Sequence, residues 1–167
     1  MKIDTKDLEK IFSYQVKLPV AIGELVRSFG LEAYRVEDME DGISGAIVKE
    51  NDKYIIYTNA NEPIVRRRFT IAHELAHYLL HKKFIDNDLN GNLTDAKSGV
   101  MYRSKLSNIY ERQANQLASE ILMPIQYLNE NNLPISLLVE KLQVSREAIK
   151  IRLNKLENKF LIKDTIN

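Results

Sequence analysis

Apolar residues recur at helical spacing in two short stretches near the start of the chain. In the first stretch they are Leu8, Ile11 and Phe12, and the second runs from 20 to 26 and is followed by Gly30. Residues three and four apart share one face of a helix, and glycine commonly ends a helix because it adopts left-handed backbone angles without steric cost. The pattern therefore predicts two short helices.

The next stretch, from Glu32 to Asn59, consists of short runs rich in Val, Ile and Tyr. Residues of these types favour strands, and Asp41-Gly42 and Asn51-Asp52 are typical of turns between them. We therefore predict a small antiparallel sheet. Its strands are Ala33–Val36, Ile43–Val48 and Lys53–Thr58.

A long helix is predicted in the middle of the chain. Asn61 is suited to cap its N-terminus, with Glu62 and Pro63 in the first turn. The helical pattern then continues to about His81. It includes an almost entirely apolar stretch, which indicates a helix buried in the core.

A polar, turn-prone segment from Asp86 to about Lys105 predicts a mobile loop. Helical spacing returns from about Leu106 to Leu122. It stops before Met123-Pro124, because a residue that precedes proline disfavours the helical conformation.

Two shorter helical patterns complete the chain after Pro134. They run from Ile135 to Leu142 and from Ser145 to Leu156. We therefore predict an α+β domain over residues 1–130, with a helical, helix-turn-helix-like tail over residues 131–167 packed on it.

Composition and charge exclude several classes of protein. The 167 residues, 44% of them hydrophobic, suffice for one compact domain or for one domain with a small appendage. The 24 basic and 23 acidic residues leave a formal net charge of +1, so no global field attracts nucleic acid or an anionic membrane. Cysteine is absent, which excludes disulfides, thiolate metal sites and a cysteine nucleophile.

The chain also lacks the sequence features of export and membrane insertion. No run approaches the roughly 18 apolar residues of a membrane span, and the first ten residues, MKIDTKDLEK, have no apolar core. We therefore expect a cytoplasmic protein without a membrane partner.

The central helix contains the sequence His73-Glu74-Leu75-Ala76-His77. Two histidines four residues apart on a helix can converge on one metal ion, while the glutamate between them flanks the site without binding the ion. We therefore propose His73 and His77 as metal ligands. The alternative is a chance match, with both histidines satisfied in the core and Glu74 on a solvated face.

A third ligand is predicted on the helix that follows the loop. Glu111 and Asn115 lie on its apolar face, whereas Gln113, Gln116 and Glu120 fall on the opposite face. A buried carboxylate needs a cation or several hydrogen bonds, and zinc held by two histidines lacks a third ligand. Glu111 is therefore assigned as the third ligand. Asn115, one turn later, is placed to hydrogen-bond a ligand histidine.

His81 offers a second route to three ligands, which we reject. Ligands at positions i, i+4 and i+8 of a helix span about 12 Å, so one helix does not wrap all three round an ion. The sequence also lacks the glycine turn of the longer three-histidine motif. We expect His81 to be a helix-end residue that interacts with the helix dipole.

The two motifs resemble those of the ImmA/IrrE family of metallopeptidases. The resemblance rests on RRRFTIAHELAHYLLH at 66–81 and ERQANQLASEILMP at 111–124, and it extends over about 20–156. It implies a zincin-like fold in which the small sheet packs on the HExxH helix. By position, it also implies that the three assigned ligands bind the metal and that Glu74 is the catalytic acid/base.

Members of this family are intracellular zinc-dependent endopeptidases that cut one helix-turn-helix repressor, typically encoded nearby on a phage or mobile element. The resemblance thus implies Zn²⁺, with Mn²⁺ as the alternative ion, and a repressor as protein substrate. The segment between His81 and Glu111 is longer than in the family's shorter versions, and the sensory domain of radiation-response relatives is lacking. The chain looks most like the short, mobile-element type.

The expected mechanism is metal-assisted hydrolysis. Zinc lowers the pKa of bound water toward about 7 and polarises the scissile carbonyl. Glu74 takes the proton of the water and delivers it to the leaving amine. An oxyanion stabiliser is needed as well, and Tyr102, Arg103 and Tyr110 all stay open for that role. We expect the loop from Asp86 to Lys105 to gate or recognise the substrate.

The tail suggests a second function of another class. Its two helices are spaced like a helix-turn-helix with Ser145 as N-cap, and six basic residues stand against two acidic ones from Ser145 to Lys163. Direct DNA binding is therefore an alternative to docking of a folded protein substrate by Arg146, Lys150 and Arg152. A third alternative keeps the fold as the toxin-like partner of a toxin-antitoxin pair.

Overall fold

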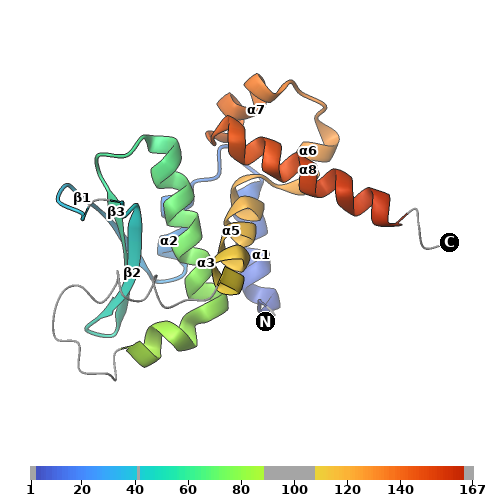
Figure 1. Ribbon diagram of the computed structural model, residues 1–167. Helices are drawn as coiled ribbons and strands as arrows, with labels where there is room; N and C mark the ends of the chain where they lie inside the picture. Colours follow the sequence, from blue (N-terminus) through green and yellow to red (C-terminus); the bar gives the residue numbers. More distant parts are fainter. Residues whose placement is uncertain (1–2, 41, 89–107, 164–167) are drawn as a thin grey trace.

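The computed structural model describes the backbone of residues 3–40, 42–88 and 108–163 (Figure 1). Its elements are α1 (Thr5–Gln15), α2 (Ile22–Ser28), β1 (Glu32–Val36), β2 (Gly45–Glu50), β3 (Lys53–Asn59), α3 (Ile64–Asp88), α5 (Asn108–Leu122), α6 (Ile125–Glu130), α7 (Ile135–Leu142) and α8 (Arg146–Lys163). All except the short helix α6 correspond to predicted elements. Across these ranges, no helix combines the length and the apolar character needed to cross a membrane.

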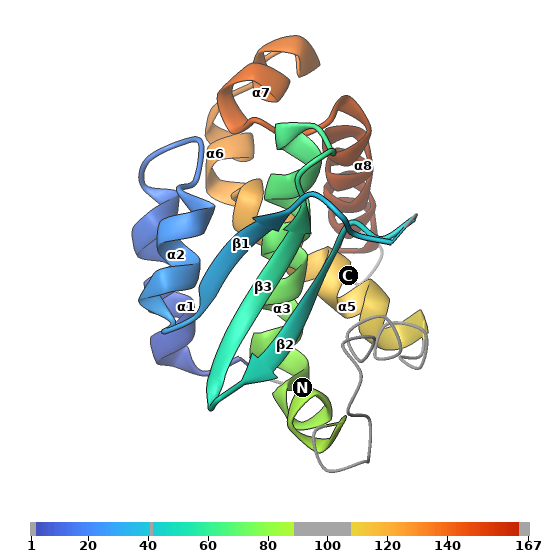
Figure 2. The same ribbon diagram turned by 90° about the vertical axis from the view of Figure 1, so that its left-hand side faces the viewer.

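The three-stranded sheet is mixed, which corrects the expectation of an antiparallel one. β2 pairs antiparallel with β3, but β1 pairs parallel with β3, so the strand order is β1-β3-β2. The expectation assumed that each strand pairs with the next one along the chain. After β1 the chain instead forms β2 at the far edge of the sheet. The strand β3 then lies between β1 and β2, so it is the central strand (Figure 2).

The turn between β2 and β3 follows the prediction. Asn51 and Asp52 both adopt left-handed backbone angles, with φ of 46° and 64°. Two successive residues with positive φ form the hairpin turn whose twist matches that of the flanking strands, and Asn and Asp tolerate this conformation better than other side chains. The local sequence therefore sets the register of this hairpin.

The helix α3 packs across one face of the sheet (Figure 2) and begins later than predicted. Its first residue is Ile64, and the backbone amide of Arg67 donates to the carbonyl of Pro63, which takes the capping position. The residue before a proline avoids helical angles, and this delays the start. Asn61 does not cap the helix, because its side-chain amide donates to the carbonyl of Glu37.

The helix α3 also bends at His81, where the backbone leaves the helical region with φ of −129° and ψ of 17°. The predicted end at this residue is therefore the end of the first helical segment, and a second segment follows it. In that second segment Asp86 accepts a hydrogen bond from Tyr54 and lies 3.7 Å from the Lys49 ammonium. The rest of the predicted mobile loop, 89–105, lies outside the described residues.

The first segment of α3 occupies the centre of the molecule, between the sheet and α5 (Figures 1 and 2). Ala72 and Ala76 of α3 and Ala114 and Ala118 of α5 are fully buried. Small buried side chains allow two helices to approach closely. This close approach brings polar side chains of both helices within reach of one another.

The tail helices α7 and α8 lie together with α6 at one end of the molecule, at the top of Figure 1. The Ser145 hydroxyl accepts from the backbone amide of Ala148 at 3.1 Å, which confirms the predicted N-cap of α8. Gln143 ends α7 with a left-handed φ of 50°. Leu142 and Ile149 are buried in the same apolar core as the rest of the chain, so the tail is held by hydrophobic contacts.

A substitution at Gly45 tests how closely β2 packs on α3. A Cβ atom there would overlap the Thr70 side chain and lie 2.5 Å from the Tyr57 carbonyl oxygen. Gly45→Ala is therefore expected to lower the free energy of unfolding by about 1–3 kcal/mol in urea titrations. Gly23→Ala is the control, because its Cβ would meet only a flexible arginine at 3.8 Å. Equal stability of the two variants would contradict the close packing.

Candidate metal centre

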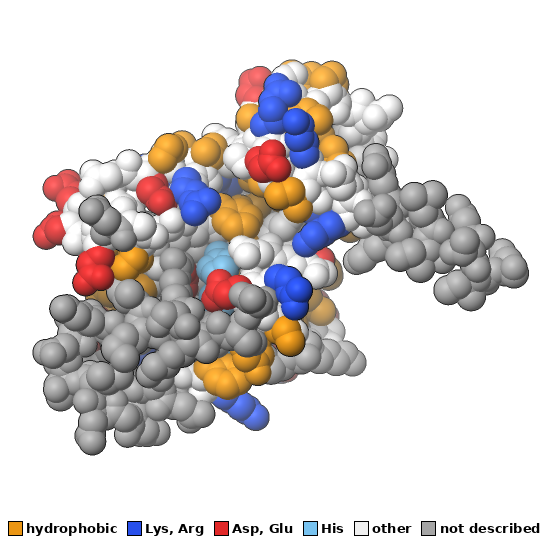
Figure 3. All heavy atoms as spheres, in the orientation of Figure 1, with side chains coloured by type: hydrophobic (Ala, Val, Ile, Leu, Met, Phe, Trp, Pro, Cys, Tyr) orange, Lys and Arg blue, Asp and Glu red, His pale blue; other side chains and the backbone are white. Residues whose placement is uncertain are grey.

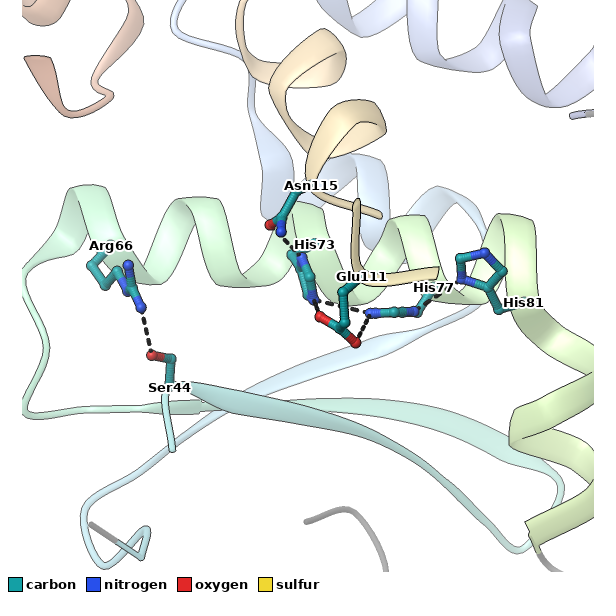
Figure 4. Close-up of polar contacts among 7 residues, drawn as sticks. All are labelled: Ser44, Arg66, His73, His77, His81, Glu111 and Asn115. Atoms are coloured by element: carbon teal, nitrogen blue, oxygen red, sulfur yellow. Dashed lines mark hydrogen bonds and ion pairs between the residues drawn. The ribbon is translucent and has the colours of Figure 1, made fainter. Parts of the chain in front are cut away.

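Three side chains from two helices converge in Figure 4. His73 and His77 lie one turn apart on α3, and Glu111 from the first turn of α5 faces both. The two histidine Nε2 atoms are 2.9 Å apart, and the carboxylate oxygens lie 3.4 Å from His73 Nε2 and 3.3 Å from His77 Nε2. The structure therefore brings together the three ligands assigned from the sequence.

The separations between these atoms suit one tetrahedral zinc ion. Nitrogen and oxygen ligands about 2.0–2.1 Å from zinc stand about 3.3 Å apart in tetrahedral geometry. One atom from each of the three side chains lies within 4.8 Å of the other two. Two imidazoles and one carboxylate are also a usual ligand set of catalytic zinc, which keeps a fourth position open. The residues present therefore fit the ion that the motif implies.

The surroundings keep two of these ligands in the protonation states that bind metal. Burial lowers the pKa of His77, whose side chain is fully buried, so its imidazole is neutral at pH 7. The neighbouring rings of His73 and His77 hold the pKa of the Glu111 carboxyl well below its ordinary value. Metal ions bind neutral imidazole and ionised carboxylate, and both forms are present without any change in pH.

Asn115 of α5 orients His73. Its Oδ1 atom lies 3.0 Å from His73 Nδ1. Because His73 Nε2 faces the ligand cluster, Nδ1 carries the proton and donates it to the amide oxygen. The hydrogen bond expected from the helical wheel is therefore present, one turn beyond Glu111.

A second pair of side chains orients His77. His77 Nδ1 lies 3.0 Å from His81 Nδ1, and His81 Nε2 lies 2.9 Å from Gln113 Oε1. With its Nε2 lone pair directed at the metal position, His77 donates its Nδ1 proton to His81, which in turn donates to Gln113. His81 is 1% exposed, and burial lowers its pKa, in agreement with the neutral ring that this arrangement needs.

The contacts of His81 with His77 and Gln113 are not predicted by helical spacing. His81 does lie at the end of a helical segment, but its buried ring is hydrogen-bonded on both nitrogens, which the helix dipole alone does not explain. The helical wheel predicts Gln113 on the face of α5 opposite Glu111, yet its long side chain reaches His81. The available signal was the row of three histidines at i, i+4 and i+8, because a buried imidazole needs a polar partner.

Of the three candidate oxyanion stabilisers, only Tyr110 belongs to the described residues. Its ring packs on His81, with 5.0 Å between ring centroids, and on Phe84 at 4.9 Å. It therefore lies beside the side chain that supports His77. The other two candidates, Tyr102 and Arg103, lie outside the described residues.

An HExxH helix packed on a small sheet, with a carboxylate from the next helix facing both histidines, defines a zincin-like fold with a candidate metal site. The chain belongs to the family described as the IrrE N-terminal-like domain, a peptidase family whose model matches residues 26–154. The matched span includes both ligand-bearing helices. The resemblance seen in the sequence is therefore confirmed.

Two known proteins show how far the similarity extends. Metallopeptidase ImmA from Bacillus subtilis is 34% identical over 82 residues, which cover 49% of this chain and 41% of that protein. A transcriptional regulator from Mycobacterium tuberculosis has a similar fold, with a TM-score of 0.57 and 17% identity over 88% of this chain and 45% of that one. The chain thus matches less than half the length of either protein.

Removing one ligand tests the metal centre directly. His77→Ala leaves two ligands, which do not hold zinc against water, so the variant is expected to lose the ion. Elemental analysis after dialysis against zinc measures the metal content of variant and parent. One full equivalent of zinc in His77→Ala would show that the metal binds elsewhere.

A substitution at His81 tests whether its hydrogen bond with His77 supports metal binding. His81→Ala removes the acceptor for His77 Nδ1 and is expected to weaken zinc affinity about 10–100-fold, measured by competition with a chelating dye. Gln116→Ala is the control, because this exposed glutamine of α5 bonds only to Glu120 among the described contacts. Equal zinc affinity in the two variants would show that His81 does not support the centre.

Proposed function

We propose that the protein is a zinc-dependent endopeptidase that cleaves a helix-turn-helix transcriptional repressor inside the cell. The observation that carries this proposal is the convergence of His73, His77 and Glu111 on one point. A structural metal site needs four protein ligands, whereas three ligands leave a position at which substrate and water can react. Membership of a peptidase family and the similarity to a metallopeptidase support the same activity.

Zinc held by these three residues supplies a Lewis acid that polarises a peptide carbonyl and acidifies water. Glu74 follows the ligand His73 directly on α3 and is 1% exposed. A carboxylate so placed beside the centre can accept the proton of the attacking water and pass it to the leaving amine. We assign to Tyr110, Tyr102 or Arg103 the stabilisation of negative charge on the carbonyl oxygen.

The repressor is proposed as the substrate on the resemblance to the ImmA/IrrE family. Cleavage of one regulator would release the genes of a phage or mobile element from repression. A protease of this kind needs strong selectivity, because unspecific hydrolysis would damage the host cell. Selectivity of that order requires contacts beyond the scissile bond, made with a larger part of the substrate.

The substitution Glu74→Gln separates hydrolysis from metal binding. The variant keeps all three ligands and is expected to bind one equivalent of zinc, yet to cleave about 10²–10⁴-fold more slowly, because general acid–base catalysis contributes a factor of that size. The assay incubates parent or variant with each helix-turn-helix protein whose gene lies near its own and follows the fragments by mass spectrometry.

A chelator provides the matching control, since it should stop cleavage by the parent and zinc should restore it. Cleavage by Glu74→Gln at the parental rate would refute the role of this residue. Absence of any cleavage by the zinc-loaded parent would refute the proposed substrate and favour a binding function.

A further inference from the structure

A groove lies next to the metal centre and is not needed for the chemistry proposed above. It has a volume of about 530 Å³ and lies between α3, α5 and α8, within the range of about 300–1,000 Å³ typical of binding pockets. Its apolar lining comes from Val65, Phe69, Val144, Ala148 and Ile151. Figure 3 shows hydrophobic side chains in a hollow directly beside the exposed part of a histidine.

The groove is continuous with the metal centre through Asn115. This residue lines the groove and also bonds to His73 at 3.0 Å. A polypeptide that lies in the groove would therefore contact a residue that is hydrogen-bonded to His73, one of the three candidate ligands. Because Asn115 belongs to both, the groove is part of the surface around the candidate metal centre.

The charged side chains around the groove are mainly basic. Arg66, Arg112 and Lys155 are exposed and line it, against one acidic residue, Glu147. Of the three, Arg66 also lies 3.8 Å from Glu62, but its own side chain remains 61% exposed. The rim thus complements a partner with acidic residues, although the chain as a whole is nearly neutral.

We propose that this groove docks a segment of the protein substrate that carries large apolar side chains with acidic residues beside them. The inference rests on the proposed function, since it names the part of the substrate that the protease holds. Ile151 is a large apolar side chain of the lining and is 49% exposed. Covering it and Phe69 by a substrate side chain removes apolar surface from water and draws the scissile region toward His73.

The structure revises the set of basic tail residues that the sequence predicts for docking of a partner. Arg152, one of three residues expected to contact a partner, is 5% exposed and lies 3.5 Å from the Glu120 carboxylate, so it holds α8 to α5. Lys150 is exposed but absent from the groove lining, whereas Lys155 lines it. These two lysines of α8 therefore form a matched pair, one inside the groove and one outside it.

The test measures binding separately from hydrolysis. Two fluorescein-labelled 16-residue peptides share leucines and phenylalanines at helical spacing and differ in flanking residues, Glu in one and Lys in the other. Each is titrated by fluorescence anisotropy with the full-length zinc-loaded Glu74→Gln protein, in which turnover is suppressed. The Glu-flanked peptide is expected to bind more tightly, by about tenfold or more, with an affinity that falls as salt rises.

Three further substitutions in that protein locate the binding site. Ile151→Asp places a charge on the apolar lining and should weaken binding of the Glu-flanked peptide about tenfold or more. Lys155→Glu should weaken it about threefold to tenfold. Lys150→Glu makes the same change of charge outside the groove and should leave the affinity within about twofold of the unsubstituted protein. Thermal melting and zinc content confirm that each variant is folded.

Failure of this inference can be told apart from failure of the proposed function. If neither peptide binds, if both lysine variants behave alike, or if duplex DNA displaces the peptide and binds more tightly, the groove is not a peptide-docking site. If the repressor is cleaved and its KM is unchanged by Ile151→Asp and Lys155→Glu, the proposed hydrolysis is supported and docking in the groove is refuted. If the peptides bind as expected but the parent protein cleaves no repressor, docking in the groove is supported and the proposed protease function is refuted.

Discussion

The contact between the Glu111 carboxylate and the two histidines of α3 is the interaction on which the rest of the site depends. Ionised carboxylates are seldom buried without a partner, because removing one such charge from water costs roughly several kcal/mol of free energy. The Glu111 side chain is 31% exposed, which reduces this cost, and a zinc ion between the carboxylate and the two imidazole nitrogens at 3.3–3.4 Å would offset the rest. The packing of α5 on α3 is thereby tied to metal binding, and a shift of either helix would separate the ligands.

The helix α5 contributes more to this arrangement than the ligand Glu111. Asn115 accepts a hydrogen bond from His73, and Gln113 accepts one from His81, which in turn accepts one from His77. Both ligand histidines therefore have a fixed tautomer with Nε2 directed at the metal position. The kink of α3 at His81 lies beside this support, at the point where the first helical segment ends.

The centre is bordered by two different surfaces. On one side lies the sheet, whose edge strand β2 packs on α3 so closely that Gly45 has no room for a side chain against Thr70. On the other side the tail helix α8 closes a groove with an apolar lining and a basic rim. Hydrolysis is assigned to the centre and recognition to the groove, with Asn115 belonging to both.

The sequence by itself determined the features that depend on spacing within one element. Two histidines at i and i+4 share a helix face whatever the fold, and the wheel of the next helix placed Glu111 and Asn115 together. Relations between elements required the tertiary structure: the parallel pairing of β1 with β3, the reach of Gln113 to His81, the burial of Arg152 against Glu120 and the groove beside α8. Helical and strand periodicities describe which residues share a face, but the direction of a long side chain and the neighbour of a strand depend on packing between segments distant in sequence.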